Sequence, residues 1–256
     1  MRYALRFATL GYLFVLLVAP VGLVFYRAFE HGFGVFWDAI TSPDAIHALK
    51  LTLIITAIAV PANTVFGIVC ALAIVRYRFP GAGVMNALVD LPLALSPVVV
   101  GLSLLLLYGR GGWLQGHNIL FALPSMVLAT MFVSLPFVVR EVVPVLREIG
   151  TEQEQAASTL GASALQTFRR VTWPSIRWAV AYGIVLTTAR SLGEFGAVTV
   201  VSGSISGRTE TLALLVGDRY EQFDATGAYA AAVLLALLAI GTLLVMYRLR
   251  PKEETR

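Results

Sequence analysis

Long apolar stretches without charge alternate with short polar segments along this chain. A helix needs about 20 mostly apolar residues to cross the hydrocarbon of a bilayer, because each residue advances it by about 1.5 Å. The stretches that meet this length are 7–26, 51–75, 91–109, 111–139, 178–202 and 225–247, the fourth having a polar start through Asn118 that we interpret as a loop. The pattern predicts an all-α, polytopic membrane protein with about six transmembrane helices.

Several polar or helix-breaking residues interrupt these stretches. Arg190 and Glu194 fall inside the stretch 178–202, and prolines 61, 92 and 97 fall inside or beside the second and third stretches. Proline frees backbone groups and can kink a membrane helix, either for gating or to fit neighbouring helices together. Between 202 and 226 the chain is polar and contains glycine, which predicts a loop. That loop is either a docking surface for another protein or a solvated connector.

The first apolar stretch also has features of a signal peptide, since Arg2 and Arg6 precede it. It is longer than a typical signal-peptide core, and no Ala-x-Ala-like cleavage site follows it. We therefore expect it to be retained as the first transmembrane helix.

Composition supports a lipid environment and excludes several classes of function. Hydrophobic residues make up 58% of the 256 residues and charged residues only 13%, against about 25% charged in a soluble protein. The single cysteine, Cys70, excludes an internal disulfide framework. The histidines at 31, 47 and 117 are far apart and show no metal-ligand spacing, so we expect no metal site.

The net charge of +4 is distributed as membrane topology requires, and we expect no nucleic-acid partner. With six crossings, both ends of the chain fall on one side. That side collects thirteen of the 19 cationic residues: Arg2, Arg6, Arg76, Arg78, Arg140, Arg147, Arg169, Arg170, Arg177, Arg248, Arg250, Lys252 and Arg256. Because short cytoplasmic loops carry an excess of lysine and arginine, this bias predicts a cell-membrane protein with both termini in the cytoplasm.

The longest segment on that side, about 140–177, has a helical apolar pattern. Its apolar positions recur every three or four residues: Ala157, Leu160, Ala164, Leu165, Phe168 and Val171. Thr151 followed by Glu154 predicts a capping box that opens a first helix. Gly161 would allow a sharp bend, and Pro174 would end a second helix. From the pattern alone, a helix lying on the lipid surface is an equal alternative.

The spacing of residues in this segment resembles the EAA loop of ABC importer permeases, which reads Glu-Ala-Ala-x3-Gly-x9-Ile-x-Leu-Pro. The matching residues are Gln155, Ala156, Ala157, Gly161, Val171, Trp173 and Pro174. The residues at 155, 171 and 173 depart from the motif, and Glu154 carries an acidic group on a different helical face. The resemblance implies that this loop docks on a cytoplasmic ATPase subunit.

Further segments are similar to the sulfate and molybdate branch of these permeases, and most similar to its CysW-type sulfate permease subunits. They are residues 90–101, 135–142, 189–198 and 202–212, and the similarity extends over about 45–245. The resemblance implies the type I ABC importer permease fold and transport of an oxyanion. Sulfate is the expected substrate, with thiosulfate possible. Molybdate or tungstate is an alternative, since both are tetrahedral dianions as well.

The family also implies which partners complete the transporter. These are cytoplasmic ABC ATPases that bind ATP and Mg, a second permease subunit that is homologous or identical, and an extracytoplasmic sulfate-binding protein. The chain itself lacks the Gly-Lys-Ser/Thr run of a phosphate-binding loop, so we expect no ATP site, no cofactor and no catalytic residue in it. We expect residues 1–47 to form a first helix and outside loop, and 48–250 to form the permease domain.

Arg190 and Glu194 are four residues apart and share one face of a helix. Charges at mid-membrane are costly, so they usually pair and usually serve function. We expect these two, with Gly193 and Gly196, to line the translocation path or its gate. An ion pair that only holds helices together is the alternative.

A channel or a secondary transporter is the competing class of function, but we find no inverted repeat of the kind such transporters carry. A membrane-embedded protease is a second competing class. It would need paired aspartates, a Ser-His pair or a His-Glu-x-x-His run within the spans, and the sequence has none of these there.

Overall fold

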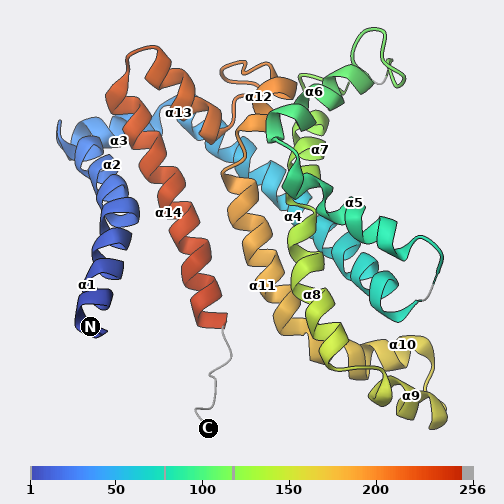
Figure 1. Cartoon of the computed structure of the whole chain (residues 1–256). Helices are drawn as coiled ribbons and strands as arrows, with labels where there is room; N and C mark the ends of the chain where they lie inside the picture. The colour runs from blue at the N-terminus through green and yellow to red at the C-terminus, as the bar shows by residue number, and fades with distance from the viewer. Residues whose placement is uncertain (1, 78, 117–118, 250–256) are drawn as a thin grey trace. The chain divides into compact units, whose positions relative to one another are not determined.

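The computed structural model describes residues 2–77, 79–116 and 119–249, and every regular element within these ranges is helical (Figure 1). Some residues used in the sequence predictions lie outside the described part of the chain: Arg78, His117, Asn118, Arg250, Lys252 and Arg256. The predicted all-α class is confirmed.

Four described helices are long and apolar enough to cross a membrane by themselves. They span Leu5–Phe29, Pro43–Arg76, Leu123–Glu148 and Ala225–Arg248. Two further candidates are bent pairs of helices: Ala82–Ala94 with Pro97–Tyr108, at 109°, and Ala164–Leu192 with Gly196–Ser202, at 53°. If each bent pair is one crossing, the total is six, as the sequence predicts.

The sharper bend corrects the prediction of one span over 91–109. Helix α5 (Ala82–Ala94) ends before Ser96, and α6 (Pro97–Tyr108) begins at the proline. Ser96 is extended, with φ −62° and ψ 135°, because the helical region is sterically disfavoured for a residue that precedes proline. Pro92, by contrast, lies inside α5.

The described residues of 1–51 and 204–238 form one compact unit, and those of 52–203 and 239–249 form a second. In the first unit, α2 (Ala19–Phe29), α3 (Phe33–Thr41) and the start of α14 (Ala225–Leu249) share an apolar core of Ala28, Phe36, Ala230 and Val233. Helix α13 (Leu212–Glu221) packs on the start of α4 (Pro43–Arg76) through Leu212, Leu215 and Ala45. The remaining helical segments of this unit are α1 (Arg2–Leu13) and η1 (Phe14–Val18), which precede α2.

Helix α13 was not predicted, because 202–226 reads as a polar loop. Its apolar residues 212–215 are all buried, whereas its second half, Asp218–Glu221, is polar. The tertiary contact with α4 therefore stabilises a helix that is too short to be stable by itself in water.

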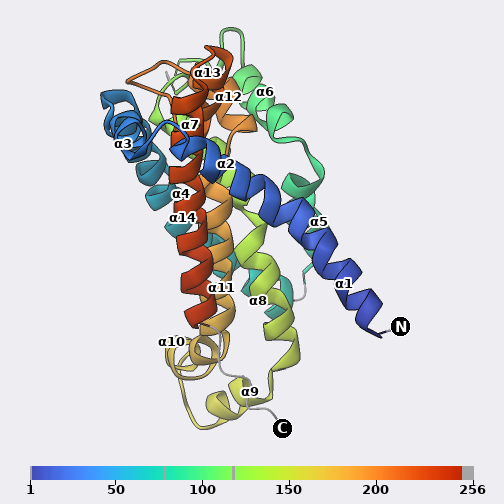
Figure 2. The same cartoon turned by 90° about the vertical axis from the view of Figure 1, so that its left-hand side faces the viewer.

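The second unit is built around α8 (Pro136–Glu148) and α11 (Trp173–Leu192), which lie side by side (Figures 1 and 2). Its other helices are α7 (Leu123–Ser134), α9 (Glu152–Thr159), α10 (Ala164–Thr167), η2 (Phe168–Thr172) and α12 (Gly196–Ser202), with α5, α6 and the later part of α4. Close approach depends on glycine. A Cβ at Gly67 would lie 2.7 Å from the Val138 Cβ, and one at Gly183 would lie 2.9 Å from the Val138 Cα. Small residues of this kind let membrane helices pack closely.

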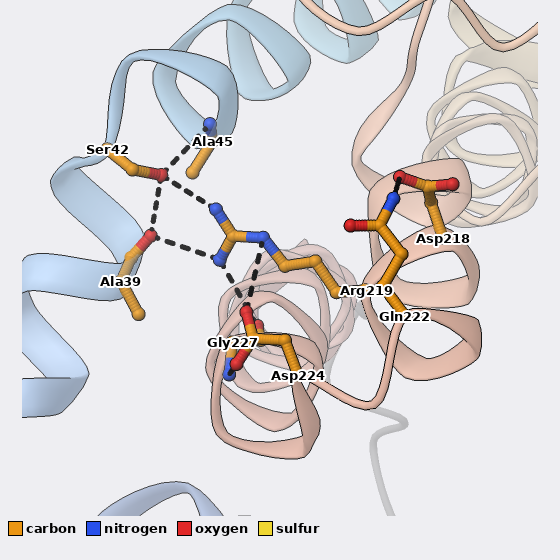
Figure 3. A network of polar contacts seen from close by, with 8 residues as sticks. All are labelled: Ala39, Ser42, Ala45, Asp218, Arg219, Gln222, Asp224 and Gly227. Atoms are coloured by element: carbon orange, nitrogen blue, oxygen red, sulfur yellow. Dashed lines mark hydrogen bonds and ion pairs between the residues drawn. The ribbon is translucent and has the colours of Figure 1, made fainter.

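Arg219 of α13 connects three elements of the first unit (Figure 3). Its Nη2 donates to the Ser42 Oγ at 2.8 Å, and its Nη1 donates to the carbonyls of Ala39 at 3.3 Å and Gly227 at 3.5 Å. The Asp224 carboxylate lies 4.0 Å from its Nε. One guanidinium thus satisfies backbone carbonyls at the end of α3 and at the start of α14, so Arg219 fixes how these helices meet.

We expect Arg219→Ala to lower the free energy of unfolding by about 1.5–3 kcal/mol, the usual range for hydrogen bonds to a charged group. Thermal unfolding of the detergent-solubilised protein measures this. Arg208→Ala is the matched control, since that side chain is exposed in the preceding loop. Equal midpoints for the two variants would contradict the expected role of Arg219.

Candidate functional site

The segment with EAA-loop spacing forms a helical elbow, which we define as α9, the bend at Gly161, and α10. Both views show the elbow beyond the ends of α8 and α11 (Figures 1 and 2). Gly161 has φ +82°, in the left-handed region that favours glycine. The Ala162 N–H donates to the Ala157 carbonyl and the Gly161 N–H donates to the Ser158 carbonyl, each at 3.0 Å. These two bonds make the Schellman motif, which ends α9 and confirms the predicted bend.

The capping box lies on the other side of the bend from the one predicted, and it begins at Ser163, two residues after Gly161. The side chain of Thr151 caps no backbone N–H of α9. Instead, Ser163 Oγ accepts from the Gln166 N–H at 3.4 Å while Gln166 Oε1 accepts from the Ser163 N–H at 2.8 Å. The prediction at Thr151 was wrong because Glu154 turns away to another partner, Arg76.

Pro174 does not end the second helix. It lies in the first turn of α11, directly after the π-helical turn Phe168–Thr172. The helical path continues from α10 through η2 into α11, so the predicted stop at Pro174 was wrong.

Part of the outer surface of the elbow carries small and apolar side chains. Ala156 and Gln155 are exposed and Ala157 is half-buried, and the Gln155 amide donates to the Thr151 hydroxyl at 3.1 Å. Leu160 is 88% exposed and Leu165 is 66% exposed. The predicted apolar stripe therefore lies largely on the surface of this chain, where a partner surface can cover it.

Arg190 and Glu194 form the predicted ion pair, with 2.7 Å between Nη1 and Oε2. The Glu194 side chain is only 2% exposed and that of Arg190 is 32% exposed. The second Glu194 oxygen, Oε1, accepts from the Ala197 N–H at 2.9 Å. This carboxylate therefore neutralises a cation at the end of α11 and also caps the start of α12, at the 53° bend.

The two glycines beside this pair differ in their surroundings. A Cβ at Gly196 would lie 3.0 Å from the Pro97 Cβ, so this glycine permits α12 to approach α6 closely. A Cβ at Gly193 would meet only the Ala189 carbonyl, at 3.9 Å. The elbow and the ion pair lie at opposite ends of α11, which is about 30 Å long at 20 residues.

Several polar contacts were not predicted from the sequence. Arg140 of α8 forms an ion pair with Asp90 of α5, and Asn63 of α4 donates to the Met131 carbonyl and to Ser134 Oγ, both at 2.9 Å. Asn63 lies inside an apolar stretch, and Asp90 and Arg140 lie at the edges of two others. Polar residues in the membrane usually have a partner there. That signal was present in the sequence, but it does not identify the partner.

Glu210, in the loop before α13, is a buried carboxyl group outside the candidate spans. It is 1% exposed, and within the described residues neither oxygen meets a donor at hydrogen-bond geometry. Burial raises the pKa of Glu210; Asp218 and Asp44 raise it further, whereas the Ser206 hydroxyl and Arg219 lower it in part. The ionised form of Glu210 is therefore less favourable in the folded protein than in the unfolded chain.

We expect Glu210→Gln to raise the unfolding midpoint at pH 7–8 by about 2–4 °C, the shift that 1 kcal/mol gives for a protein of this size. Since the pKa is raised on folding, the folded state binds the extra proton, and stability falls as pH rises above the ordinary glutamate value. The gain should vanish near pH 4. Glu221→Gln is the control, and a gain of equal size at both pH values would contradict the pKa argument.

The fold defines a class: all-helical polytopic membrane proteins with a helical elbow beyond the ends of two long helices. A family model for the "binding-protein-dependent transport system inner membrane component" matches residues 63–254. The chain belongs to this family of ABC transporter permeases.

Individual relatives agree with the family. The sulfate transport system permease protein CysW of Synechococcus elongatus is 50% identical over 243 residues, which is 93% of this chain and 85% of that protein. The sulfate transport system permease protein CysT of Escherichia coli K12 is 39% identical over 241 residues, 90% of this chain and 87% of that one. These relatives confirm the resemblance found in the sequence.

Among solved structures, a bacterial alginate ABC transporter, crystallised with a periplasmic protein bound to an alginate pentasaccharide, has the same fold. Its matched chain superposes with a TM-score of 0.79, covering 96% of this chain and 92% of that one at 19% identity. The type I ABC importer permease fold predicted from the sequence is confirmed.

Proposed function

We propose that this chain is one of the two membrane-spanning subunits of an ATP-driven importer of sulfate, with thiosulfate as a further possible substrate. The observation that carries the proposal is 50% identity to a sulfate permease along 93% of the chain. Identity at this level over nearly the whole chain supports the same substrate class as well as the same fold. Molybdate and tungstate have the same shape and charge, so the test must separate them from sulfate.

We further propose that the elbow docks on a cytoplasmic ABC ATPase, which binds ATP and Mg. The small side chains of Ala156 and Ala157 and the exposed Leu160 and Leu165 offer a surface that another protein can approach closely. The left-handed Gly161 fixes the angle between the two short helices. Pro174 lies in the first turn of the long helix α11, and α10, η2 and α11 follow one another directly. A displacement of the elbow can therefore be transmitted along α11.

The remaining partners are a second permease subunit and an extracytoplasmic binding protein. Two related kinds of sulfate permease, CysW and CysT, are both similar to this chain, which favours a homologous rather than an identical partner. The alginate transporter with its bound periplasmic protein supports a binding-protein partner on the far side of the membrane. The excess of lysine and arginine on the side that carries both ends of the chain supports a cell membrane location with both termini in the cytoplasm.

At the other end of α11, we propose that Arg190, Gly193, Glu194 and Gly196 line the translocation path or its gate. The buried Glu194 links the cation of α11 to the start of α12 exactly at a break in the helix, and broken helices are where transporters place such residues. Substrate selectivity then lies chiefly in the binding protein, where a dry site can direct several donors at the anion.

The test is uptake of labelled sulfate and labelled molybdate, measured side by side in a strain that lacks this chain and in the same strain complemented with it. Loss of sulfate uptake on deletion, restored on complementation, is the expected result. Unchanged sulfate uptake with lost molybdate uptake would overturn the substrate and leave the transporter class in place. Uptake that persists after ATP depletion would overturn the ATP-driven mechanism.

A further inference from the structure

A buried polar cluster joins the elbow to the long helices of the second unit. We call it the Arg76 clamp and define it as Arg76, Glu154, Thr172 and the backbone carbonyl of Leu146. The Arg76 Nε lies 2.9 Å from the Glu154 Oε2, and its Nη2 donates to Oε1 at 3.2 Å. The Thr172 hydroxyl donates to the same Oε1 at 2.7 Å, and the Arg76 Nη1 donates to the Leu146 carbonyl at 3.0 Å.

The four members of the clamp come from four different elements. Arg76 is the last residue of α4, Leu146 lies in the last turn of α8, Glu154 lies in the first turn of α9, and Thr172 ends η2 just before α11. Each of the two charges suits the helix end beside which it lies. A cation satisfies a free carbonyl at the end of α8, and an anion lies near the amino-terminal end of α9. The elbow is therefore attached to all three long helices at one point.

The side chains of the clamp are largely shielded from water. The Arg76 side chain is 11% exposed and the Glu154 side chain is 21% exposed, while Thr172 is 4% exposed. Ion pairs that water screens contribute little, but removal of one partner from a buried pair leaves a charge without compensation. A displacement of α9 must consequently either break these contacts or move α4, α8 and α11 with it.

Two features beside the clamp give room for such movement. The turn Phe168–Thr172 is π-helical, with one residue more per turn than the α-helices around it, and such turns recur at functional sites. A cavity of about 570 Å³ lies against the clamp and is lined by Leu72, Ala73, Ser158, Thr167 and Phe168, among others. The elbow is thus held by polar contacts rather than by a filled apolar core.

We propose that the Arg76 clamp is the joint through which movement of the elbow passes to α4, α8 and α11, with Arg76 and Glu154 as positioning residues for transport. The inference rests on the proposed docking of the elbow on the ATPase. The clamp determines whether ATP hydrolysis moves the membrane helices, while the outer surface of the elbow determines whether the ATPase binds.

The test uses the whole transporter, purified through the permease and reconstituted in liposomes with its ATPase, second permease subunit and sulfate-loaded binding protein. The variants are Arg76→Gln, Glu154→Gln, Thr172→Val and the double variant of the first two. Glu152→Gln is the matched control, because it removes an exposed acidic group from the same turn of α9. Four quantities are measured: the amount of ATPase that co-purifies, the basal ATPase rate, the ATPase rate with loaded binding protein, and sulfate uptake with loaded binding protein.

In Arg76→Gln and Glu154→Gln, we expect the amount of co-purified ATPase and the basal ATPase rate to remain within about twofold of wild type. Stimulation of the ATPase by the loaded binding protein and sulfate uptake should both fall about tenfold, a typical size for coupling between sites. The double variant should be no worse than either single variant, because the two side chains act as one unit. Thr172→Val should have a smaller effect in the same direction, and Glu152→Gln none.

Two outcomes would overturn the clamp: unchanged stimulation in both charge variants, or a loss of stimulation that only follows a loss of assembled complex. The second outcome would make the pair purely structural. If wild-type permease captured no ATPase at all, the proposed function itself would fail, and the two failures are therefore distinguishable.

Discussion

Gly161→Trp is expected to abolish transport, with at least a hundredfold loss of sulfate uptake, while the protein still inserts in the membrane. Gly161 has φ +82°, a conformation that costs a residue with a side chain roughly 1–2 kcal/mol. No neighbouring atom lies within 4 Å of a Cβ placed there, so the first atom of a new side chain meets no other part of the fold. The bulk would instead project from the elbow and prevent the close approach of the ATPase.

The measurements are ATPase co-purification in detergent and uptake in the complemented deletion strain. Gly161→Asn is the matched control, because asparagine tolerates left-handed backbone angles better than other side chains and is much smaller. It should retain most of the co-purification and uptake. Normal capture of the ATPase by the tryptophan variant would contradict the docking role of the elbow.

The second large effect is expected at the ion pair of Arg190 and Glu194. Arg190→Ala leaves a carboxylate that is 2% exposed without its cation, at a cost of about 3–5 kcal/mol for a buried pair. The loss should appear as a lower unfolding midpoint and little or no uptake. Glu194→Ala should lower stability less through the charge that it leaves unpaired, since the Arg190 side chain is 32% exposed to solvent. It also removes the carboxylate that caps the start of α12.

Combining Arg190→Ala with Glu194→Gln should restore much of the lost stability. Glutamine removes the stranded charge and keeps an oxygen that accepts from the Ala197 N–H. A double-mutant cycle on unfolding midpoint and uptake measures the coupling. Additive effects of the two substitutions would show that the residues act independently. Restored stability without restored uptake would separate a role of the charges in the translocation path from their role in folding.

Much of the fold was predictable because the signals are local. The length of an uncharged apolar stretch decides whether a helix can span a membrane, and this property belongs to each stretch alone. The bend at Gly161 was predictable for a similar reason, since glycine is the residue that readily adopts the left-handed conformation of the turn. Arg190 and Glu194 were predictable as a pair because their spacing places them on one helical face.

Other features depended on neighbours that are distant in sequence. The partners of Arg76, Arg140 and Asn63 lie 78, 50 and 71 residues away along the chain. A charge at the edge of an apolar stretch, or an amide inside one, signals that a partner exists, but only helix packing decides which one. For the same reason the capping box at Thr151 failed, because Glu154 binds the Arg76 guanidinium rather than the start of its own helix.

The sequence by itself determined the class of fold, the approximate number of spans, the position of the elbow and the family, because hydrophobic length and residue spacing are properties of short segments. The tertiary structure decided where α5 gives way to α6, that α13 is a helix, and that Arg76 ties the elbow to three long helices. The physical reason is that a buried charge or a short helix is stable only when a partner brought near by folding compensates it.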